Sequence, residues 1–515
     1  MRRREFIAGT AAAAGLAAAG AGGQPAAAWS AGPVAHLLPT VSHERMRVKL
    51  SLREPAAGPL FLHLDNRRVP GRRTDTAGEF WSFDAAGLDP ARTYTLSLAD
   101  GAGRPLCDPW PLSTFPTPGE RPRSLRVLFF TCAGGHDVSG RYLPMATRAR
   151  LLDRALSFGP QALVAIGDHV YWDLRTAARV GSLEPAISHA GRFARELPVL
   201  GGPNEAVLKR AAGPQIAPLY GARCRSVPVF FLQDDHDYFE NDDANERIVA
   251  FPPDPFMLAA ARATQRLWYP EFLPDPARPA GLGSTRPDGL SESFGTLRYG
   301  GLLEALLYDC RRYMTLSGPH AAFLPGETEA WLARRMAEGE TAHLLNIPST
   351  PPGWSAGKWG EWYPDVERDA RLTTAVQKPY WQPGWRAQHD RLLAAASAMR
   401  DRAPVFVSGD LHAIGETRIG GNGGQDLSRH PVVSVLCGPV GTADRGWPSA
   451  FRGMVPQTPA GLAVDESLPA IEENGFTLAD FTPEDVTLRF FKWRREPAEA
   501  IDRLEPFRTT TLPRA

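Results

Sequence analysis

Metal-ligand side chains follow four short apolar segments of this 515-residue sequence. Segments 127–131, 162–167, 228–233 and 404–409 run directly into Cys132, Asp168, Asp234 and Asp410. Close behind these positions come Tyr171, Asp235, His236, Asn241 and His412. Ligands of open α/β sheets bind beyond the carboxyl ends of the strands, so we expect the four segment ends to meet at one pocket.

The residue types at these segment ends predict metal chemistry. Carboxylate and amide oxygens suit hard cations, whereas thiolate, phenolate and imidazole groups suit a transition metal. A carboxylate shared by two cations places them about 4 Å apart, which is the spacing used to hold a phosphate group and activate water. The sequence does not separate Asp234 from Asp235 as a ligand, although Asp235 is favoured because it directly precedes His236.

Each of these side chains also has a structural interpretation. A lone buried cysteine usually acts as a small hydrophobic residue. Asp168 and Asp410 both follow a glycine, where a turn or helix-cap role is the alternative. Tyr171 and His412 could simply pack in the core. The position of Cys132 at the end of an apolar strand favours a ligand, while the remaining cysteines are interpreted as structural: Cys107, Cys224, Cys310 and Cys437.

The elements that must position these residues change in type along the chain. Residues 31–116 contain strand-like stretches at 46–52, 60–64 and 94–98 separated by turns, which predicts a small antiparallel β-sandwich domain. A proline-rich joint follows. From residue 124 to residue 515 apolar strands alternate with helical patterns at 145–158, 327–336 and 386–400, which predicts a layered α/β domain.

The N-terminus indicates export. Arg3 and Arg4 precede Phe6 and Ile7, a small-residue apolar run covers residues 8–23, and residues 26–28 offer a cleavage site. This order is typical of a secretory signal and resembles a twin-arginine signal, so residues 1–30 are predicted to be removed outside the cytoplasm. The run is too short and too weakly apolar for a transmembrane anchor. With 57 basic and 57 acidic residues the net charge is zero, so no stable nucleic-acid partner is expected.

Three short motifs of the sequence resemble those of a known protein family. Residues 167–171 (GDHVY), 234–237 (DDHD) and 409–412 (GDLH) resemble the ordered motifs of the calcineurin-like metallophosphoesterases. Cys132 in place of that superfamily's usual first motif, Tyr171 and Asn241 are similar to the PhoD-type alkaline phosphatases and phosphodiesterases. The resemblance implies a metallophosphoesterase β-sandwich flanked by helices, preceded by an Ig- or fibronectin-like N-terminal domain.

The same resemblance implies roles for individual residues. It implies an Fe(3+) site made by Cys132, Asp168, Tyr171 and His412, and a Ca(2+) site bridged by Asp168 with Asp235 or Asp234, Asn241 and Asp410; other divalent metals remain possible. His236 occupies the position of a histidine that contacts substrate and assists protonation of the leaving oxygen. Catalysis is thus expected to involve His236, Asp168 and His412. Arg311 is a candidate phosphate ligand, with a structural salt bridge as an equal alternative.

These expectations combine into one preferred function and two alternatives. The preferred function is hydrolysis of phosphate mono- and diesters in the periplasm or outside the cell, after export by the twin-arginine machinery. The substrates would be small-molecule or polymeric phosphate esters. One alternative is a narrower phosphodiesterase acting on phospholipids or polymers. The other is a secreted binding protein of the same fold without turnover.

Overall fold

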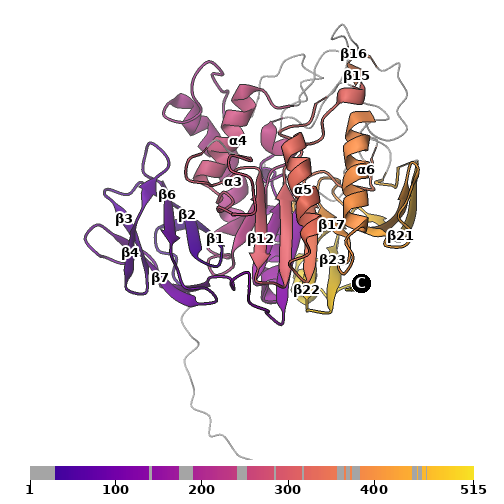
Figure 1. Ribbon diagram of the computed structural model, residues 1–515. Coiled ribbons are helices and arrows are strands. Elements are labelled where there is room, and N and C mark those ends of the chain that lie inside the picture. Colours follow the sequence, from indigo (N-terminus) through magenta and orange to yellow (C-terminus); the bar gives the residue numbers. More distant parts are fainter. Residues whose placement is uncertain are drawn as a thin grey trace, which may run out of the picture. The chain divides into compact units, whose positions relative to one another are not determined.

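Two large sheets hold the strands that end in the predicted ligands (Figure 1). The first has the order β11-β10-β9-β22-β23-β24 and the second the order β12-β13-β14-β17-β20-β18-β19. The first sheet consists of β9 (Leu125–Thr131), β10 (Ala162–Ile166), β11 (Val229–Leu232), β22 (Asn474–Phe481), β23 (Asp485–Trp493) and β24 (Arg508–Pro513). The second consists of β12 (Phe294–Tyr299), β13 (Leu303–Tyr308), β14 (His343–Pro348), β17 (Val405–Ser408), β18 (Ile414–Asn422), β19 (Gln425–Asp426) and β20 (Val432–Cys437), with β21 (Leu462–Ile471) paired to β18.

The computed structural model describes residues 29–137, 142–172, 190–239, 252–283, 286–315, 318–356, 365–366, 372–373, 383–442, 449, 455–459 and 461–514. Residues 31–515 form one compact unit. The predicted signal segment lies outside the described residues up to position 28, and so does the candidate ligand Asn241. The short strands β15 (Asp365–Val366) and β16 (Leu372–Thr373) pair with each other.

Helices cover the outer faces of both sheets. The apolar cores that they form with the strands consist of fully buried leucine, isoleucine, phenylalanine and tryptophan side chains. On the first sheet lie α1 (Met145–Ser157), α3 (Pro203–Tyr220) and α4 (Pro255–Leu267), and on the second α5 (Gly326–Glu338) and α6 (Pro383–Ser397). No helix within the described ranges has both the length and the apolar run needed to cross a membrane. The predicted layered α/β class is confirmed.

Local sequence explains where these elements begin. The strand β9 is apolar from Val127 to Phe130 and is buried along nearly its whole length, as expected for a strand covered on both faces. Helix α4 begins after Asp254, whose side chain accepts hydrogen bonds from the N–H groups of Phe256 and Met257. Helix α3 contains Pro214 and Pro218 in its interior, and this explains why no helix was predicted there.

The N-terminal region is all-β, as predicted. One antiparallel sheet has the order β1-β2-β6-β5 and the other β4-β3-β7-β8. Their bounds are β1 (Val34–Val41), β2 (Arg45–Leu52), β3 (Leu60–Leu64), β4 (Arg67–Pro70), β5 (Arg72–Arg73), β6 (Phe80–Ala86), β7 (Thr93–Asp100) and β8 (Trp110–Ser113). The short helices η2 (Asp235–Tyr238), η3 (Gly318–His320) and η4 (Ala498–Arg503) complete the described elements.

Strand β2 differs from its sequence-based interpretation as a half-buried strand. Its polar face is buried as well, because it packs against the segment that follows α4. Lys49 Nζ lies 2.9 Å from Glu271 Oε2 and donates to the Gln265 carbonyl at 2.6 Å. Arg47 Nε donates to the same Glu271 oxygen at 3.0 Å. These partners offset the cost of burying charged groups. The polar residues that alternate with apolar ones along β2 therefore do not face solvent.

Replacing Glu271 is expected to destabilise the protein. Burial alone raises the pKa of Glu271, but Lys49 and Arg47 outweigh it and lower the pKa to about 2. Since this value lies below the ordinary 4.5, the stabilisation exists above pH 4.5 and is lost as the pH falls towards 2. We expect Glu271→Gln to lower the unfolding free energy at pH 7 by about 3 kcal/mol, because buried Lys49 loses its carboxylate partner and Arg47 keeps only Asp84.

Thermal and urea unfolding at pH 7 and pH 3 measure this effect. The exposed Glu44→Gln serves as the matched control and should unfold like the wild type. The gap between Glu271→Gln and wild type should shrink at pH 3. A Glu271→Gln protein as stable as wild type at pH 7 would show that the ionic cluster contributes nothing.

Candidate metal centre

The candidate ligands sit on sharp turns at the strand ends. Cys132 directly follows β9, while Asp168 and Asp410 come two residues after β10 and β17. Cys132, Asp168 and Asp410 adopt positive φ angles of 49°, 59° and 65°, and His412 has a φ of 52°. Such left-handed conformations are costly for residues with a side chain, and they cluster at functional sites. They direct side chains from separate strands towards one place.

Gly167 allows one of these turns to form. Its φ is 68°, and a Cβ atom at this position would lie 2.3 Å from the Cβ of Asp234. Any larger residue would therefore push the turn that carries Asp168 away from the turn that carries Asp234. The glycine at the end of the predicted strand 162–167 thus lets two candidate ligands approach each other.

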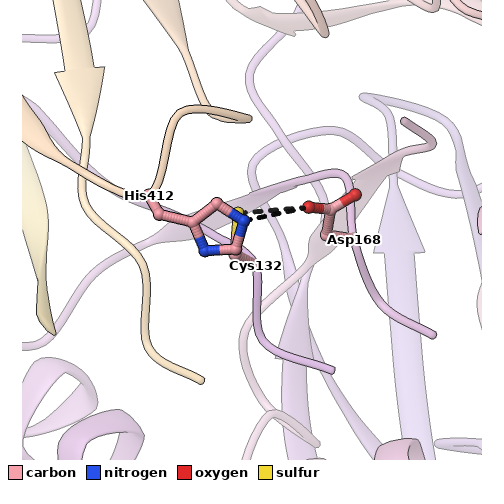
Figure 2. Close-up of side chains that lie close together, drawn as sticks. All are labelled: Cys132, Asp168 and His412. Carbon is pink, nitrogen blue, oxygen red and sulfur yellow. Dashed lines mark hydrogen bonds and ion pairs between the residues drawn. The ribbon is translucent and has the colours of Figure 1, made fainter. Parts of the chain in front are cut away.

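Four of the predicted ligands meet at one carboxylate oxygen. Cys132 Sγ lies 3.3 Å and Tyr171 Oη 2.7 Å from Asp168 Oδ2, and both donate a hydrogen bond to it. His412 Nε2 lies 3.9 Å from the same oxygen and 3.3 Å from Tyr171 Oη. Figure 2 shows the side chains of Cys132 and His412 on the same side of Asp168, with dashed lines joining both to its carboxylate. Thiol, phenol, imidazole and carboxylate donors are thereby collected within one buried group.

Burial and a neighbouring charge both oppose ionisation of the thiol and of the phenol. Burial first, and the neighbouring Asp168 carboxylate second, raise the pKa of Cys132 and of Tyr171 well above their ordinary values. The hydrogen bonds that both groups donate to Asp168 Oδ2 agree with their protonated forms. A metal ion would take the place of these protons, since a thiolate and a phenolate are the forms that bind metals. The donor set fits a transition-metal ion.

Two further groups of potential ligands adjoin the first. Asp168, Asp235 and His236 offer ligand atoms that all lie within 4.8 Å of one another, and so do Asp234, Asp235 and Asp410. Asp235 belongs to both groups, whereas Asp234 belongs to one. The ring of His236 lies beside that of Tyr171, with 4.1 Å between the ring centroids. The structure therefore brings together every predicted ligand that it describes.

Arg311, the candidate phosphate ligand, contacts the group formed by Asp234, Asp235 and Asp410. Its Nε donates to Asp234 Oδ1 at 2.7 Å, and its Nη2 lies 3.1 Å from Asp410 Oδ1. The sequence left open whether Arg311 binds phosphate or forms a structural salt bridge. The structure contains the salt bridge. Burial raises the pKa of Asp234 well above its usual range, and the Arg311 guanidinium opposes this shift.

Asp237 holds two of the ligand-bearing turns together. Its Oδ2 accepts hydrogen bonds from the N–H groups of Asp168 and Asp234, both at 2.9 Å. Its Oδ1 accepts from the N–H groups of His169 at 2.9 Å and Val170 at 3.2 Å. The DDHD motif placed Asp237 near the site, but residue types alone did not reveal this positioning role.

Gln215 and Arg148 support the turn after β9, and sequence reasoning missed both. Gln215 Oε1 accepts from the N–H groups of Gly135 at 2.6 Å and Tyr171 at 2.8 Å, and its Nε2 donates to the Tyr171 carbonyl at 2.9 Å. Arg148 donates to the carbonyls of Gly134 and Gly135 at 2.9 Å and 2.6 Å. Gln215 had no sequence signal, because the prolines in α3 obscured the helix that carries it.

The arrangement of two sheets flanked by helices matches that of solved structures of other proteins. One solved structure that shares it is that of PhoD, with 14% sequence identity, 93% of this chain and 90% of that chain covered, and a TM-score of 0.61. Another is the purple acid phosphatase PPD1 from yellow lupin (Lupinus luteus), with 11% identity, coverage of 93% and 74%, and a TM-score of 0.53. No family model and no curated protein matches the sequence. The likeness establishes the fold, and the resemblance inferred from the motifs is confirmed at that level.

Removing the Gln215 amide is expected to loosen the centre without touching a ligand. Gln215→Met removes the hydrogen bonds that Gln215 makes to the Gly135 N–H, the Tyr171 N–H and the Tyr171 carbonyl, which costs about 1–3 kcal/mol for each buried group left unsatisfied. We expect a lower melting temperature and weaker iron binding, measured by titration of the metal-free protein. The exposed Gln161→Met serves as the matched control. Unchanged stability and iron affinity in Gln215→Met would contradict the positioning role.

Proposed function

We propose that this chain is a metal-dependent phosphoesterase that hydrolyses phosphate mono- and diesters. The convergence of Cys132, Tyr171 and His412 on Asp168 is the observation that carries the proposal. The metallophosphoesterase fold shared with PhoD and a purple acid phosphatase supports it. The donor types are those that the motif resemblance implies for an iron and calcium centre.

We assign the ligands as follows. Cys132, Asp168, Tyr171 and His412 would hold Fe(3+), and Asp168, Asp235, Asp410 and Asn241 would hold Ca(2+). When bound, such cations polarise the phosphoryl oxygens, stabilise charge in the transition state and lower the pKa of the attacking water. The buried surroundings of Asp168 and Asp235 keep solvent away from the donors and strengthen these interactions.

The chain's own residues would orient the substrate and move protons. His236 is only partly buried, unlike its neighbour Asp235, so its imidazole is available at the edge of the ligand groups. We propose that it contacts the phosphate ester and donates a proton to the leaving oxygen. The ring contact with Tyr171 fixes the orientation of the imidazole towards the site.

We also propose that the chain is exported through the twin-arginine pathway and acts in the periplasm or outside the cell. The Arg3-Arg4 pair and the apolar run over residues 8–23 support this. The pathway carries folded proteins, so the centre could be loaded with metal before export. A fusion of residues 1–30 to a reporter protein would test export, with Arg3→Lys and Arg4→Lys together expected to block it.

Hydrolysis assays test the proposed activity. Protein loaded with iron and calcium should hydrolyse p-nitrophenyl phosphate, bis-p-nitrophenyl phosphate or both. We expect Asp168→Asn and Cys132→Ser to lower kcat/KM at least about 100-fold, because each loses a ligand. Cys107→Ser, which alters a buried thiol of the N-terminal β region, serves as the matched control and should remain active.

Two results would contradict the proposal. One is a metal-loaded protein that hydrolyses neither chromogenic ester, nor any phospholipid, nucleotide or polymeric phosphate ester. The other is a Cys132→Ser protein with wild-type metal content and activity. Hydrolysis of phospholipids or polymers alone would instead favour the narrower phosphodiesterase.

A further inference from the structure

A cavity lies at the end of the second large sheet that is opposite to the candidate metal centre. Its volume is about 490 Å³, and its walls come from the C-terminal parts of α5 and α6 and from the segment that leads into β17. Arg402 lines it three residues before β17 begins, whereas Asp410 follows the other end of the same strand. The cavity is therefore separate from the candidate metal centre.

Arg402 is a buried arginine without a carboxylate partner. The residue is 4% exposed, and its Nη2 donates to the carbonyl of Met336 in the last turn of α5. Within the described ranges its Nε and Nη1 have no hydrogen-bond partner, and no carboxylate lies within ion-pair distance of its guanidinium. The contact with Met336 is a helix-capping interaction that uses one N–H group. The remaining N–H groups are available to a molecule in the cavity.

The other buried arginines of the described chain are better satisfied than Arg402. One of them, Arg278, donates to three backbone carbonyls. The others each contact a carboxylate: Arg47, Arg148, Arg311, Arg312 and Arg335. Burying a guanidinium without a counter-charge is costly, so the exception at Arg402 indicates that its partner is a ligand.

Two further arginines give the cavity an excess of positive charge. Arg514 Nε donates to the carbonyl of Asp401 at 2.9 Å, and Arg400 lies on the exposed rim. In the part of the chain that the structure describes, neither arginine is paired with a carboxylate. The side chain of Asp401 is the single acidic group among the residues that line the cavity. An anion is therefore the ligand that the charges favour.

The walls of the cavity are mainly apolar. They consist of small or flexible side chains of α5, of α6 and of the residues that follow α6: Ala333, Met336, Ala337, Ala395, Ala398 and Met399. Cavities of about 300–1,000 Å³ with apolar walls and a few polar groups are typical of small-molecule sites. An inorganic ion alone would leave these walls without contacts, whereas an organic anion would cover them.

We propose that this cavity binds a small organic anion whose head group accepts hydrogen bonds from Arg402. A carboxylate or a phosphate-type group has the chemistry to receive the N–H groups of a guanidinium. Arg400 and Arg514 add positive charge beside the head group, and the apolar walls hold the organic part. The site uses no residue of the candidate metal centre, so the proposal does not depend on the proposed activity.

The electrostatic environment of Arg402 supports this assignment. Burial lowers the pKa of Arg402, and Glu304 opposes the shift. Arg335 and Arg514 lower the pKa further, while Asp401 raises it. An anion in the cavity would add the counter-charge that these neighbours do not supply. Because the folded protein alone has this site, binding should also raise the melting temperature.

Binding of two model anions tests the proposal. Octanoate and octylphosphonate carry different anionic heads on similar apolar chains, and octanol carries such a chain without a charge. Each is titrated calorimetrically into the full metal-loaded chain, and melting temperatures are measured alongside. We expect at least one anion to bind with a Kd below about 1 mM and octanol not to bind. The anion that binds more tightly identifies the head group.

Arg402→Gln is expected to weaken anion binding at least about 10-fold, because hydrogen bonds to a charged group are lost. Arg210→Gln is the matched control, since exposed Arg210 also donates to a backbone carbonyl, that of Ala190. It should bind the anion like the wild type. Asp168→Asn should do so as well, because Asp168 lies in the candidate metal centre.

Several results would overturn the proposed anion site while leaving the phosphoesterase proposal intact. These are the absence of binding by both anions, equal binding of octanol, and an unchanged affinity in Arg402→Gln. Binding that is weakened only in Asp168→Asn would place the anion at the metal centre and overturn the proposal too. If Arg402→Gln does not fold, Ala398→Glu decides, since it adds a carboxylate to the cavity wall and keeps Arg402. Unchanged anion affinity in Ala398→Glu would contradict the site.

Discussion

Asp168 Oδ2 accepts hydrogen bonds from Cys132 and from Tyr171, and this shared oxygen is the constraint around which the candidate centre is arranged. The three residues come from the ends of neighbouring strands and can meet only if the chain turns sharply after each strand. Parallel pairing of β9 with β10 places these two strand ends side by side. β17, which leads to Asp410 and His412, belongs to the other sheet. The centre therefore depends on how the two sheets pack.

The left-handed turns have an energetic cost that the surrounding structure offsets. Each such residue costs on the order of 1–3 kcal/mol. Asp237 binds four backbone N–H groups across two of the turns, and Gln215 binds the backbone of Tyr171 and Gly135. Gly409 packs closely against Thr131: a Cβ atom at position 409 would lie only 2.1 Å from Thr131 Oγ1. Hydrogen bonding and close packing thus hold the turns that carry the candidate ligands in position.

Sequence alone predicted the elements that directly precede the site, because these strands are short and mostly apolar runs that end at turns. Cysteine, tyrosine and histidine beside carboxylates at the strand ends indicated a metal site, and the motif resemblance implied the role of each. It did not predict α3, whose internal prolines are unusual in a helix, and so Gln215 went unnoticed. Asp234 and Asp410, which contact Arg311, lie 77 and 99 positions away from it in the chain, and only the three-dimensional fold identifies them. Likewise, the polar side of β2 is typical of an exposed face until α4 and Glu271 are in place.

Anomalous diffraction at the iron edge, from crystals of the chain grown with iron and calcium, tests the central claim most directly. The account predicts one strong iron peak among Cys132 Sγ, Asp168 Oδ2, Tyr171 Oη and His412 Nε2. Crystals that contain iron but show its peak elsewhere, or with these four donor atoms still bonded only to one another, would contradict it.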